Sequence, residues 1–506
     1  MKNQHPEEQQ LPMLWGHPKG LYYLFFAEMW ERFSYYGMRA LLVVYMTQQL
    51  LYTDKMSFGV YAAYGSLVYV TPMIGGMIAD RYLGYRKAIY LGSILMMMGH
   101  AMLSIEHPVF FYGALGIVIV GNGFFKPNIS SMVGGLYENM NDKREAGFNI
   151  FYIGINLGGM IAPLICAWLG IEYGWHYGFG LAGIGMLLGL LTFYGAVKRN
   201  VFGKVGLEPQ NGASLKKWIF PGALLVTPLF SLIIFYNEIE HYMVWGVLVA
   251  FIFFIRHISL RVSKIERQRL WVITYFTVLA TFFWAIFEQA GSSLVLFAER
   301  NVNLVGMNAA QTNSINSAFI MILAIPFSLL WAFLTKKGKN PASPYKMAFG
   351  LVFLGIGYLV FALSAQFADN WARVPMFFLI FGTFIYTVGE MFLSPVGLSK
   401  VTELSPMKYA AFIMGIWFLS SFYGHFFAGQ LAGLTSVEVE QLWMKEGVWG
   451  ELIHFVTGLS PDGEGAFAQL YQYAGTYAVF AVFTVIIGVI GLLLAPQVKK
   501  FMHGVN

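Results

Sequence analysis

The stretch GMIADRYLGYRK, residues 76–87, separates two long apolar segments. The apolar residues before it span about 57–80, and those after it span 87–106. Within the stretch, Gly84 allows a sharp reversal of the chain, and Arg86 is one of several basic residues. A short basic turn between apolar segments is typical of neighbouring membrane spans, because basic loops stay on the cytoplasmic side. The stretch therefore predicts two transmembrane helices joined by a cytoplasmic turn.

The rest of the chain has the composition of a membrane protein. Of its 506 residues, 57% are hydrophobic and only 11% are charged, whereas soluble domains carry about 25% charged residues. Crossing a hydrocarbon core takes about 20 apolar residues, and fourteen such stretches are present. They lie near residues 21–50, 57–80, 87–106, 108–136, 146–171, 175–197, 216–236, 240–262, 268–298, 310–335, 346–367, 373–402, 408–431 and 468–496. We therefore expect an all-α integral membrane protein with 14 transmembrane helices in a lipid bilayer.

The positions of Lys and Arg predict the orientation of the chain. If the N-terminus is cytoplasmic, most of the 32 basic residues lie in the tails and inside loops. The basic residues then left outside are Lys55, Arg300, Arg373 and Lys445. An even number of spans places both termini in the cytoplasm. The net charge of +6 follows from this topology, so no nucleic-acid partner is predicted.

The loops divide the spans into six, two more and a final six. Paired bundles with a binding site between them at mid-membrane are a common transporter design. The expected parts are a cytoplasmic tail at 1–20, a six-helix bundle at 21–197, a linker with two additional transmembrane helices at 198–266, a second six-helix bundle at 267–498 with a periplasmic insertion near 432–467, and a cytoplasmic tail at 499–506.

The insertion at 432–467 mixes acidic and aromatic residues. They are Glu438, Glu440, Glu446, Glu451, Asp462, Glu464, Trp443, Trp449 and Phe455. A short amphipathic helix on the outer membrane surface and a plain spacer both fit this pattern. The sequence leaves the two alternatives open.

Apart from residues near the span ends that are assigned to the loops, seven charged residues lie within the predicted spans. They are Glu28, Glu31, Arg32 and Arg39 in the first span, Lys126 in the fourth, Glu288 in the ninth and Glu390 in the twelfth. Each costs at least about 2.5 kcal/mol to insert, so such residues persist where they pair or face water. Helical spacing places those of the first span on one face. An ion-pair network that only locks helices together is the alternative to a functional site.

The balance of these charges favours proton binding. Four carboxylates and three cations leave one negative charge unmatched, which a proton would neutralise. The protonation of a buried glutamate depends on whether its basic partner is engaged. A substrate that takes the cation away would therefore make the glutamate accept a proton, which is the physical basis of proton coupling.

Polar and aromatic residues on the spans complete a predicted binding site. They are Tyr35, Tyr36, Tyr69, Asn156, Trp284, Asn316, Trp417 and Ser421. Helix packing is the alternative for any single aromatic residue, and helix-to-helix hydrogen bonding is the alternative for an asparagine. Gly- and Pro-rich breaks at 121–128 and 389–397 contain Lys126 and Glu390. Irregular backbone at membrane depth is tolerated where it lines protein or water.

Several motifs resemble those of known transporters. GMIADRYLGYRK resembles the loop signature GxxxDRxGxRK of the major facilitator superfamily, which implies twelve core helices that alternate access. AEMWERFSYYG at 27–37 resembles the ExxERFxYY signature of proton-dependent oligopeptide transporters, a branch of that superfamily. FYIGINLGG at 151–159 is similar to the second signature of this family. Further similar stretches are FFKPN at 124–128, FWAIFEQAGSS at 283–293, GEMFLSPVGLS at 389–399 and MGIWFLSS at 414–421. The resemblance covers the whole chain, and two helices inserted between the halves are typical of bacterial members.

The resemblance implies roles for these residues. Glu28, Glu31 and Arg32 would form the proton-handling cluster, and Glu288 would pair with Arg39. Lys126 would pair with Glu390 when no substrate is bound. With a peptide bound, Lys126 and Arg39 would attract its carboxylate, and Glu390, Asn156 and Asn316 would hold its amino end. The side-chain pockets would be shaped by Tyr36, Tyr69, Trp284, Trp417 and Ser421. Ala62 stands where some members carry a histidine, so histidine is not expected to be the main coupling group. His425 is expected to be a hydrogen-bonded residue of the helix bundle.

Together these features predict a proton-coupled symporter that imports di- and tripeptides by alternating access across a bacterial inner membrane. The proton is the coupling ion, and we expect no cofactor and no metal. No HExxH, GxSxG or GxxxxGK motif is present, so an enzyme is not predicted. The main alternative is a proton-coupled transporter of another small anion or amphiphile, such as nitrate or a drug-like compound. Peptide preference, proton stoichiometry and oligomeric state stay open.

Overall fold

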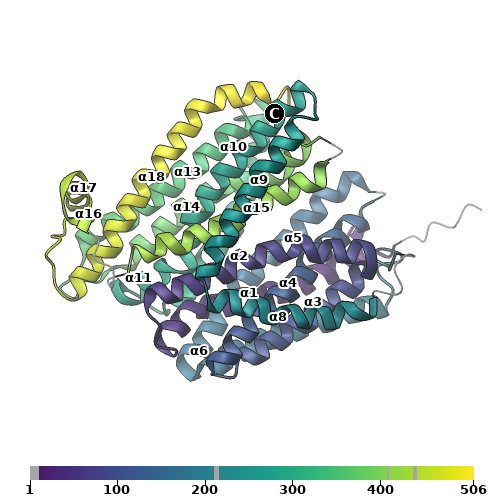
Figure 1. Ribbon diagram of the computed structural model, residues 1–506, viewed down its shortest axis with the longest axis horizontal. Helices are drawn as coiled ribbons and strands as arrows, with labels where there is room; N and C mark the ends of the chain where they lie inside the picture. The colour runs from purple at the N-terminus through teal and green to yellow at the C-terminus, as the bar shows by residue number, and fades with distance from the viewer. Residues whose placement is uncertain (1–10, 139, 210–215, 407–408, 437–441, 506) are drawn as a thin grey trace, which may run out of the picture. The chain divides into compact units, whose positions relative to one another are not determined.

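The computed structural model describes residues 11–138, 140–209, 216–406, 409–436 and 442–505, most of which are helical (Figure 1). Each of the fourteen predicted spans is helical over most of its described length. By length and composition, eleven helical stretches in the described part of the chain can cross a membrane, and Asp54–Leu103 contains two predicted spans. The first and thirteenth spans form α1 (Lys19–Gln48) and α15 (Ala410–Gly433). The prediction of an all-α membrane protein is confirmed.

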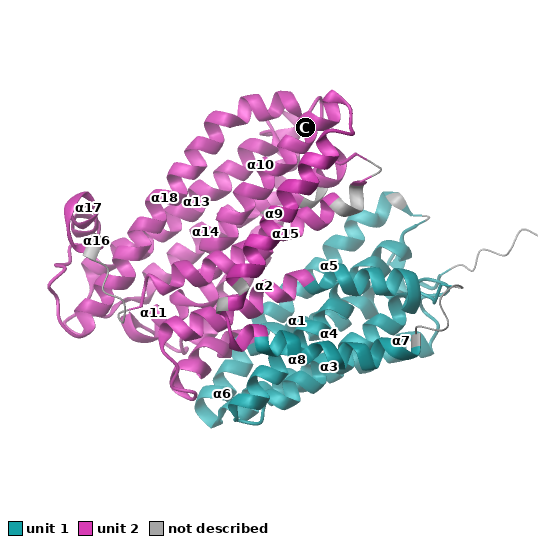
Figure 2. Cartoon of the chain, in the orientation of Figure 1, with its two compact units in different colours: residues 1–38, 71–232 teal, residues 39–70, 233–506 magenta. Residues whose placement is uncertain are grey.

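The helices group into two compact units (Figure 2). Unit 1 comprises Met1–Met38 and Thr71–Leu232, and unit 2 comprises Arg39–Val70 and Ile233–Asn506. Helices α1 and α2 (Asp54–Ile78) therefore contribute residues to both units. The predicted bundle boundaries stay a prediction.

The remaining elements follow this grouping. Unit 1 contains the antiparallel strands β1 (Met13–Leu14) and β2 (His17–Pro18), the π-helical turn η1 (Ala79–Leu83), α3 (Gly84–Leu103), α4 (Pro108–Leu136), α5 (Asn141–Ala162), the π-helical turn η2 (Pro163–Ala167), α6 (Trp168–Tyr173), α7 (Trp175–Lys198) and most of α8 (Lys216–Phe235). Unit 2 contains α9 (Glu238–Ser259), α10 (Lys264–Phe287), the 3-10 turn η3 (Glu288–Gly291), α11 (Ser293–Asn301), β3 (Val302–Asn303), the 3-10 turn η4 (Ala310–Thr312), α12 (Asn313–Lys336), α13 (Ser343–Leu363), the 3-10 turn η5 (Ser364–Phe367), β4 (Val374–Pro375), which pairs in parallel with β3, α14 (Met376–Leu404), α16 (Leu442–Lys445), α17 (Gly447–Thr457) and α18 (Ala466–Phe501).

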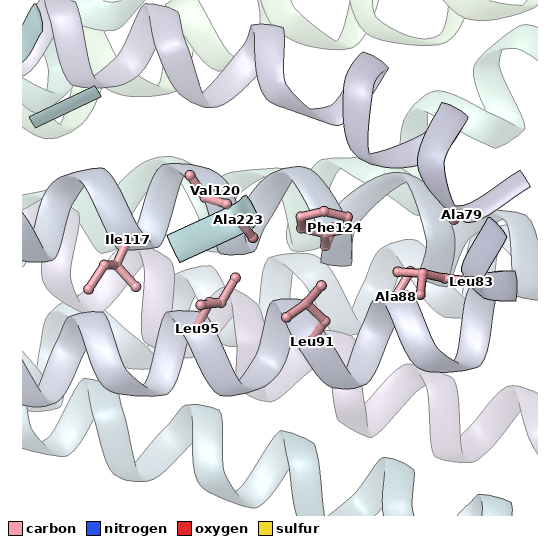
Figure 3. Close-up of a cluster of buried hydrophobic side chains, with 9 residues drawn as sticks. All are labelled: Ala79, Leu83, Ala88, Leu91, Leu95, Ile117, Val120, Phe124 and Ala223. Atoms are coloured by element: carbon pink, nitrogen blue, oxygen red, sulfur yellow. The ribbon is translucent and has the colours of Figure 1, made fainter. Parts of the chain in front are cut away.

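The core of unit 1 forms where α3 and α4 pack closely. A Cβ atom on Gly92 of α3 would lie 2.6 Å from the carbonyl oxygen of Gly121 on α4, so the close approach requires glycine. Beside this contact, apolar side chains of both helices meet in one buried cluster (Figure 3). Its members are Ala79, Leu83, Ala88, Leu91, Leu95, Ile117, Val120, Phe124 and Ala223. Ala79 and Leu83 of the turn at 76–87 belong to this cluster, so the turn is packed against α3 and α4.

Arg86, in the same turn, holds the segment that follows α7. Its Nη2 donates to the Gly203 carbonyl at 2.6 Å and its Nε donates to the Val205 carbonyl at 2.8 Å. Its backbone N–H donates to the Gly206 carbonyl at 3.1 Å. The basic turn therefore binds the start of the predicted linker through backbone carbonyls.

We expect Arg86→Ala to release this segment. Hydrogen bonds from a charged donor contribute about 1.5–3 kcal/mol each, and this variant loses two of them. Limited proteolysis in detergent should cut the chain faster between residues 200 and 209. Arg81→Ala is the matched control because Arg81 is exposed in the same turn. Equal cleavage rates in the two variants would contradict the role of Arg86 in holding the segment that follows α7.

The two additional helices pack in different units. Ala223 of α8 belongs to the apolar cluster of unit 1. In unit 2, Val244 of α9 packs against Phe422 and Phe426 of α15, and the Tyr423 hydroxyl donates to the Val244 carbonyl at 3.2 Å. Each additional helix is thus a packed part of one unit.

The predicted insertion contains the helices α16 and α17, at the end of α18 away from the C-terminus (Figure 1). The Tyr471 hydroxyl donates to the Met444 carbonyl at 2.7 Å, and Trp449 stacks on Phe483 with ring centroids 5.4 Å apart. Phe455 on α17 is 82% exposed. A short helix therefore forms there, and its place on the outer membrane surface stays a prediction. Glu438 and Glu440 lie outside the described residues, as do residues 1–10 of the predicted N-terminal tail, and the side chain of Trp443 is not described.

Candidate functional site

Glu28, Glu31 and Arg32 form a buried charge cluster on the part of α1 that belongs to unit 1. Arg32 Nη2 donates to Glu31 Oε1 at 2.7 Å and Arg32 Nε donates to Glu31 Oε2. Arg32 Nε also lies 3.3 Å from Glu28 Oε1. The guanidinium carbon lies 5.1 Å from the ring centroid of Tyr35 and 5.9 Å from that of Tyr36. Residues three and four positions apart share a helix face, so this part of α1 brings the predicted residues together.

Helix α5 packs against α1 beside this cluster. A Cβ atom on Gly158 would lie 2.3 Å from the Met29 carbonyl and 3.0 Å from the Arg32 Cβ. The glycines of the FYIGINLGG stretch therefore let α5 approach the charged cluster closely. Asn156, two residues earlier, donates from Nδ2 to the Tyr152 carbonyl of its own helix at 3.0 Å.

Lys126 on α4 belongs to the same unit. It acts electrostatically on the Glu28 carboxylate, so unit 1 holds two of the predicted cations and two of the predicted carboxylates. Its expected partner Glu390 belongs to unit 2. The pairing of these two residues stays a prediction.

In unit 2, the partly buried Arg39 and the buried Glu288 form an ion pair between α1 and the turn η3. Arg39 Nη2 donates to Glu288 Oε2, and Arg39 Nε donates to the Tyr61 hydroxyl of α2 at 2.5 Å. A Cβ atom on Gly291 would lie 1.8 Å from the Tyr61 hydroxyl and 3.0 Å from Arg39 Nη2. The pair that the family resemblance implied is present, and the glycine of FWAIFEQAGSS makes room for it.

A second carboxylate of unit 2 is held by neutral groups. Asn316 Nδ2 on α12 donates to Glu390 Oε2 on α14 at 3.0 Å, and to the Thr387 hydroxyl at 3.0 Å. Glu390 is buried, and the charge of Glu288 acts on it electrostatically. The structure therefore joins two of the three residues expected at the amino end of a peptide, Asn316 and Glu390, whereas Asn156 donates within its own helix.

The predicted aromatic residues of unit 2 all have packing partners. Tyr69 lies over His425 with ring centroids 4.9 Å apart, and Trp284 meets Phe287 edge to face at 5.3 Å. Trp417 is 8% exposed. These contacts fit a role in helix packing, and they also fit a place in the wall of a binding site.

Three residues near the charges were not predicted as site residues. Tyr61 binds Arg39, Thr387 binds Asn316, and His425 Nε2 lies 3.4 Å from Glu288 Oε2. The spacing of Tyr61, Gly65 and Tyr69 at every fourth position of one helix is a signal that could have identified Tyr61. His425 forms the expected bundle hydrogen bond, from Nδ1 to the Ser421 carbonyl at 2.9 Å, and faces the ion pair as well. Ser421 thus contributes its backbone oxygen.

Comparison with known proteins shows which family the chain belongs to. A model described as the POT family matches residues 86–448. The chain is 34% identical to an uncharacterized transporter, YclF, of Bacillus subtilis, over 97% of this chain and 96% of that protein. It is 34% identical to the peptide transporter YePEPT of Yersinia enterocolitica, over 85% of this chain and 90% of that protein. It is 31% identical to a di-/tripeptide transporter of Lactococcus lactis, over 97% of this chain and 98% of that protein.

Solved structures show the same similarity. The crystal structure of the peptide transporter POT in complex with sulfate has a TM-score of 0.81 and 32% identity, and the match covers 98% of each chain. A variant of the peptide transporter POT in complex with alafosfalin has a TM-score of 0.80 and 33% identity, again over 98% of each chain. The resemblance seen at residues 27–37 and 151–159 is therefore confirmed, and the chain belongs to the POT family of membrane transporters, with the major facilitator fold.

Proposed function

We propose that this chain is a proton-coupled symporter that imports di- and tripeptides by alternating access. Support comes from the relatives, which include a di-/tripeptide transporter and a peptide transporter. Further support comes from the similar structure that holds alafosfalin. The charges of unit 2 supply a physical reason for this substrate class.

The observation that carries the proposal is the set of charges around Arg39 in unit 2. Glu288 is paired with Arg39, whereas Glu390 receives its hydrogen bond from the neutral amide of Asn316. A peptide zwitterion would add one ammonium and one carboxylate. The ammonium fits Glu390 and Asn316, and the carboxylate fits Arg39. A short peptide would therefore give Glu390 and Arg39 partners of opposite sign, and the carboxylate of Glu288 would be left without its cation.

Proton coupling follows from the same charges. When the peptide carboxylate takes the guanidinium of Arg39, Glu288 loses its cation and becomes a proton acceptor. In unit 1, two carboxylates share the guanidinium of Arg32, and Glu28 Oε2 has no hydrogen-bond donor among the described residues. We propose that Glu288 and the cluster of Glu28, Glu31 and Arg32 carry the coupled protons. Lys126 would help Arg39 attract the peptide carboxylate, Asn156 would help hold the amino end, and Tyr36, Tyr69, Trp284, Trp417 and Ser421 would shape the side-chain pockets.

The location proposed for the transporter is the bacterial inner membrane, with both termini in the cytoplasm. The distribution of Lys and Arg along the sequence supports this orientation. The insertion with α16 and α17 would then lie on the periplasmic side. The proton would be the only coupling ion, with no cofactor.

Reconstitution in liposomes tests the proposal. An inside-alkaline gradient should drive accumulation of labelled dialanine above equilibrium, and an uncoupler should abolish the accumulation. Labelled nitrate in the same vesicles tests the alternative of anion transport. Dialanine that never exceeds equilibrium, in vesicles that accumulate nitrate, would overturn the peptide assignment and support the alternative.

A further inference from the structure

The carboxylate of Glu288 has a second basic neighbour. His425 on α15 places Nε2 at 3.4 Å from Glu288 Oε2, the same oxygen that accepts the hydrogen bond from Arg39 Nη2. His425 and Glu288 are 2% and 3% exposed, so bulk water is excluded from their contact. A guanidinium and an imidazole therefore converge on one buried carboxylate oxygen.

The hydrogen bond on the other side of the ring decides which nitrogen carries a proton. His425 Nδ1 lies 2.9 Å from the Ser421 carbonyl oxygen. A carbonyl oxygen only accepts, so Nδ1 must be the donor, and a neutral imidazole then has its lone pair on Nε2. That lone pair would face the carboxylate oxygen of Glu288, and two acceptors would meet in a buried place. One proton between Nε2 and Oε2 converts this repulsion into a hydrogen-bonded pair.

The space around the ring holds it in this position. A Cβ atom on Gly65 of α2 would lie 2.2 Å from His425 Cδ2, so α2 can pass the ring only with glycine there. Tyr69, one turn further along α2, covers the ring face. The titratable and charged groups that face the pair within unit 2 are Arg39 on α1, Tyr61 and Tyr69 on α2, Tyr358 on α13, and Tyr386 and Glu390 on α14.

We propose that His425 is a further proton-coupling residue, which shares with Glu288 the proton already assigned to that carboxylate. The inference rests on the proposed function and deepens it. The proton comes from water on the outer side, resides between Nε2 and Oε2, and leaves to water on the inner side. While it is bound, Arg39 and the protonated pair carry a net charge of +1, whereas without it their net charge is zero. The protonated state therefore loosens Arg39 from Glu288 and attracts the peptide carboxylate, so that proton binding and peptide binding favour each other.

The pH profile of transport distinguishes this role from a packing role. Histidine normally titrates between about pH 5 and 8, so driven dialanine uptake by the wild type should fall as the outer pH rises through this range. In His425→Gln, the proton loses one of the two groups that bind it, so a higher proton concentration is needed to fill the site. We expect the midpoint of the profile to move to lower pH by at least about one unit, because the lost interaction between adjacent ionisable groups is of that size. His257→Gln, a histidine on α9, is the matched control and should keep the wild-type midpoint.

A second variant leaves the histidine in place. Gly65→Ala should push the imidazole away from Glu288 and shift the midpoint in the same direction as His425→Gln. Exchange of labelled for unlabelled dialanine at equal pH on both sides should persist in both variants, which shows that they fold and bind peptide.

Peptide uptake by the wild type that is independent of pH between 5 and 8 would overturn the inference without any variant. Wild-type midpoints in both variants would also overturn it while the proposed function stands. No movement of dialanine in the wild type, by gradient or by exchange, would instead remove the proposed function and the inference with it.

Discussion

Glu288→Gln should strongly reduce the accumulation of dialanine driven by a proton gradient. Gln keeps nearly the volume of the side chain but neither pairs with Arg39 as an anion nor binds a proton. Arg39 then stays available to the peptide carboxylate at every pH, so peptide binding no longer depends on a proton. The coupling free energy between two ligands is typically about 1–3 kcal/mol, and its loss should reduce driven uptake by about 5- to 150-fold. Initial rates in liposomes with an inside-alkaline gradient measure the effect.

Exchange at equal pH separates coupling from binding in this variant. Exchange of labelled for unlabelled dialanine requires peptide binding and the alternation of access, but no net proton movement. We expect it to persist in Glu288→Gln. Glu403→Gln is the matched control because Glu403 is an exposed carboxylate on α14 that pairs with Lys400. Driven uptake that stays at the wild-type level in Glu288→Gln would show that this carboxylate is not the coupling group.

Arg32→Met should destabilise the protein strongly. The substitution leaves the carboxylates of Glu28 and Glu31 buried without their guanidinium. Removing one partner of a buried ion pair destabilises a protein by about 3–5 kcal/mol, because an uncompensated charge remains in a low-dielectric place. Cys166 provides the measurement, since it is the only cysteine of the chain and is buried in unit 1. A maleimide fluorophore in detergent should react with it at a clearly lower temperature in the variant.

Two further substitutions show whether charge or shape causes the loss. Arg32→Lys keeps the charge but cannot bond Glu31 with two nitrogens, so it should fall between the wild type and Arg32→Met. Adding Glu28→Gln and Glu31→Gln to Arg32→Met removes the uncompensated charges and should restore part of the lost stability. If Arg32→Met unfolds at the wild-type temperature, the cluster contributes no stability.

Much of the candidate site could be found from the sequence, because charges inside apolar segments stand out. Glu31 and Arg32 follow Glu28 by three and four positions, which is about one helical turn, so their shared face follows from helix geometry alone. The contact between Arg39 and Glu288 does not follow from helix geometry, because 249 positions separate these residues. The family resemblance implied that contact, and no rule of spacing within a helix could have supplied it.

The role of His425 illustrates the limit of such reasoning. One histidine on an apolar helix predicts only a local hydrogen bond, which the Ser421 carbonyl indeed accepts. Its nearness to Glu288 depends on the packing of α15 beside α2, where Gly65 leaves room for the ring. The same holds for Tyr61, whose hydroxyl reaches Arg39 because Gly291 has no side chain.

The sequence by itself determined that the chain is an all-α membrane protein, and to which family it belongs. The physical reason is that the hydrocarbon core demands about 20 apolar residues per span and penalises every charge it contains. Only the tertiary structure decided that His425 faces Glu288, that Tyr61 binds Arg39, and that α8 and α9 pack in different units. Those contacts depend on close approach between helices that are distant along the chain, which small residues permit but spacing within a helix does not specify.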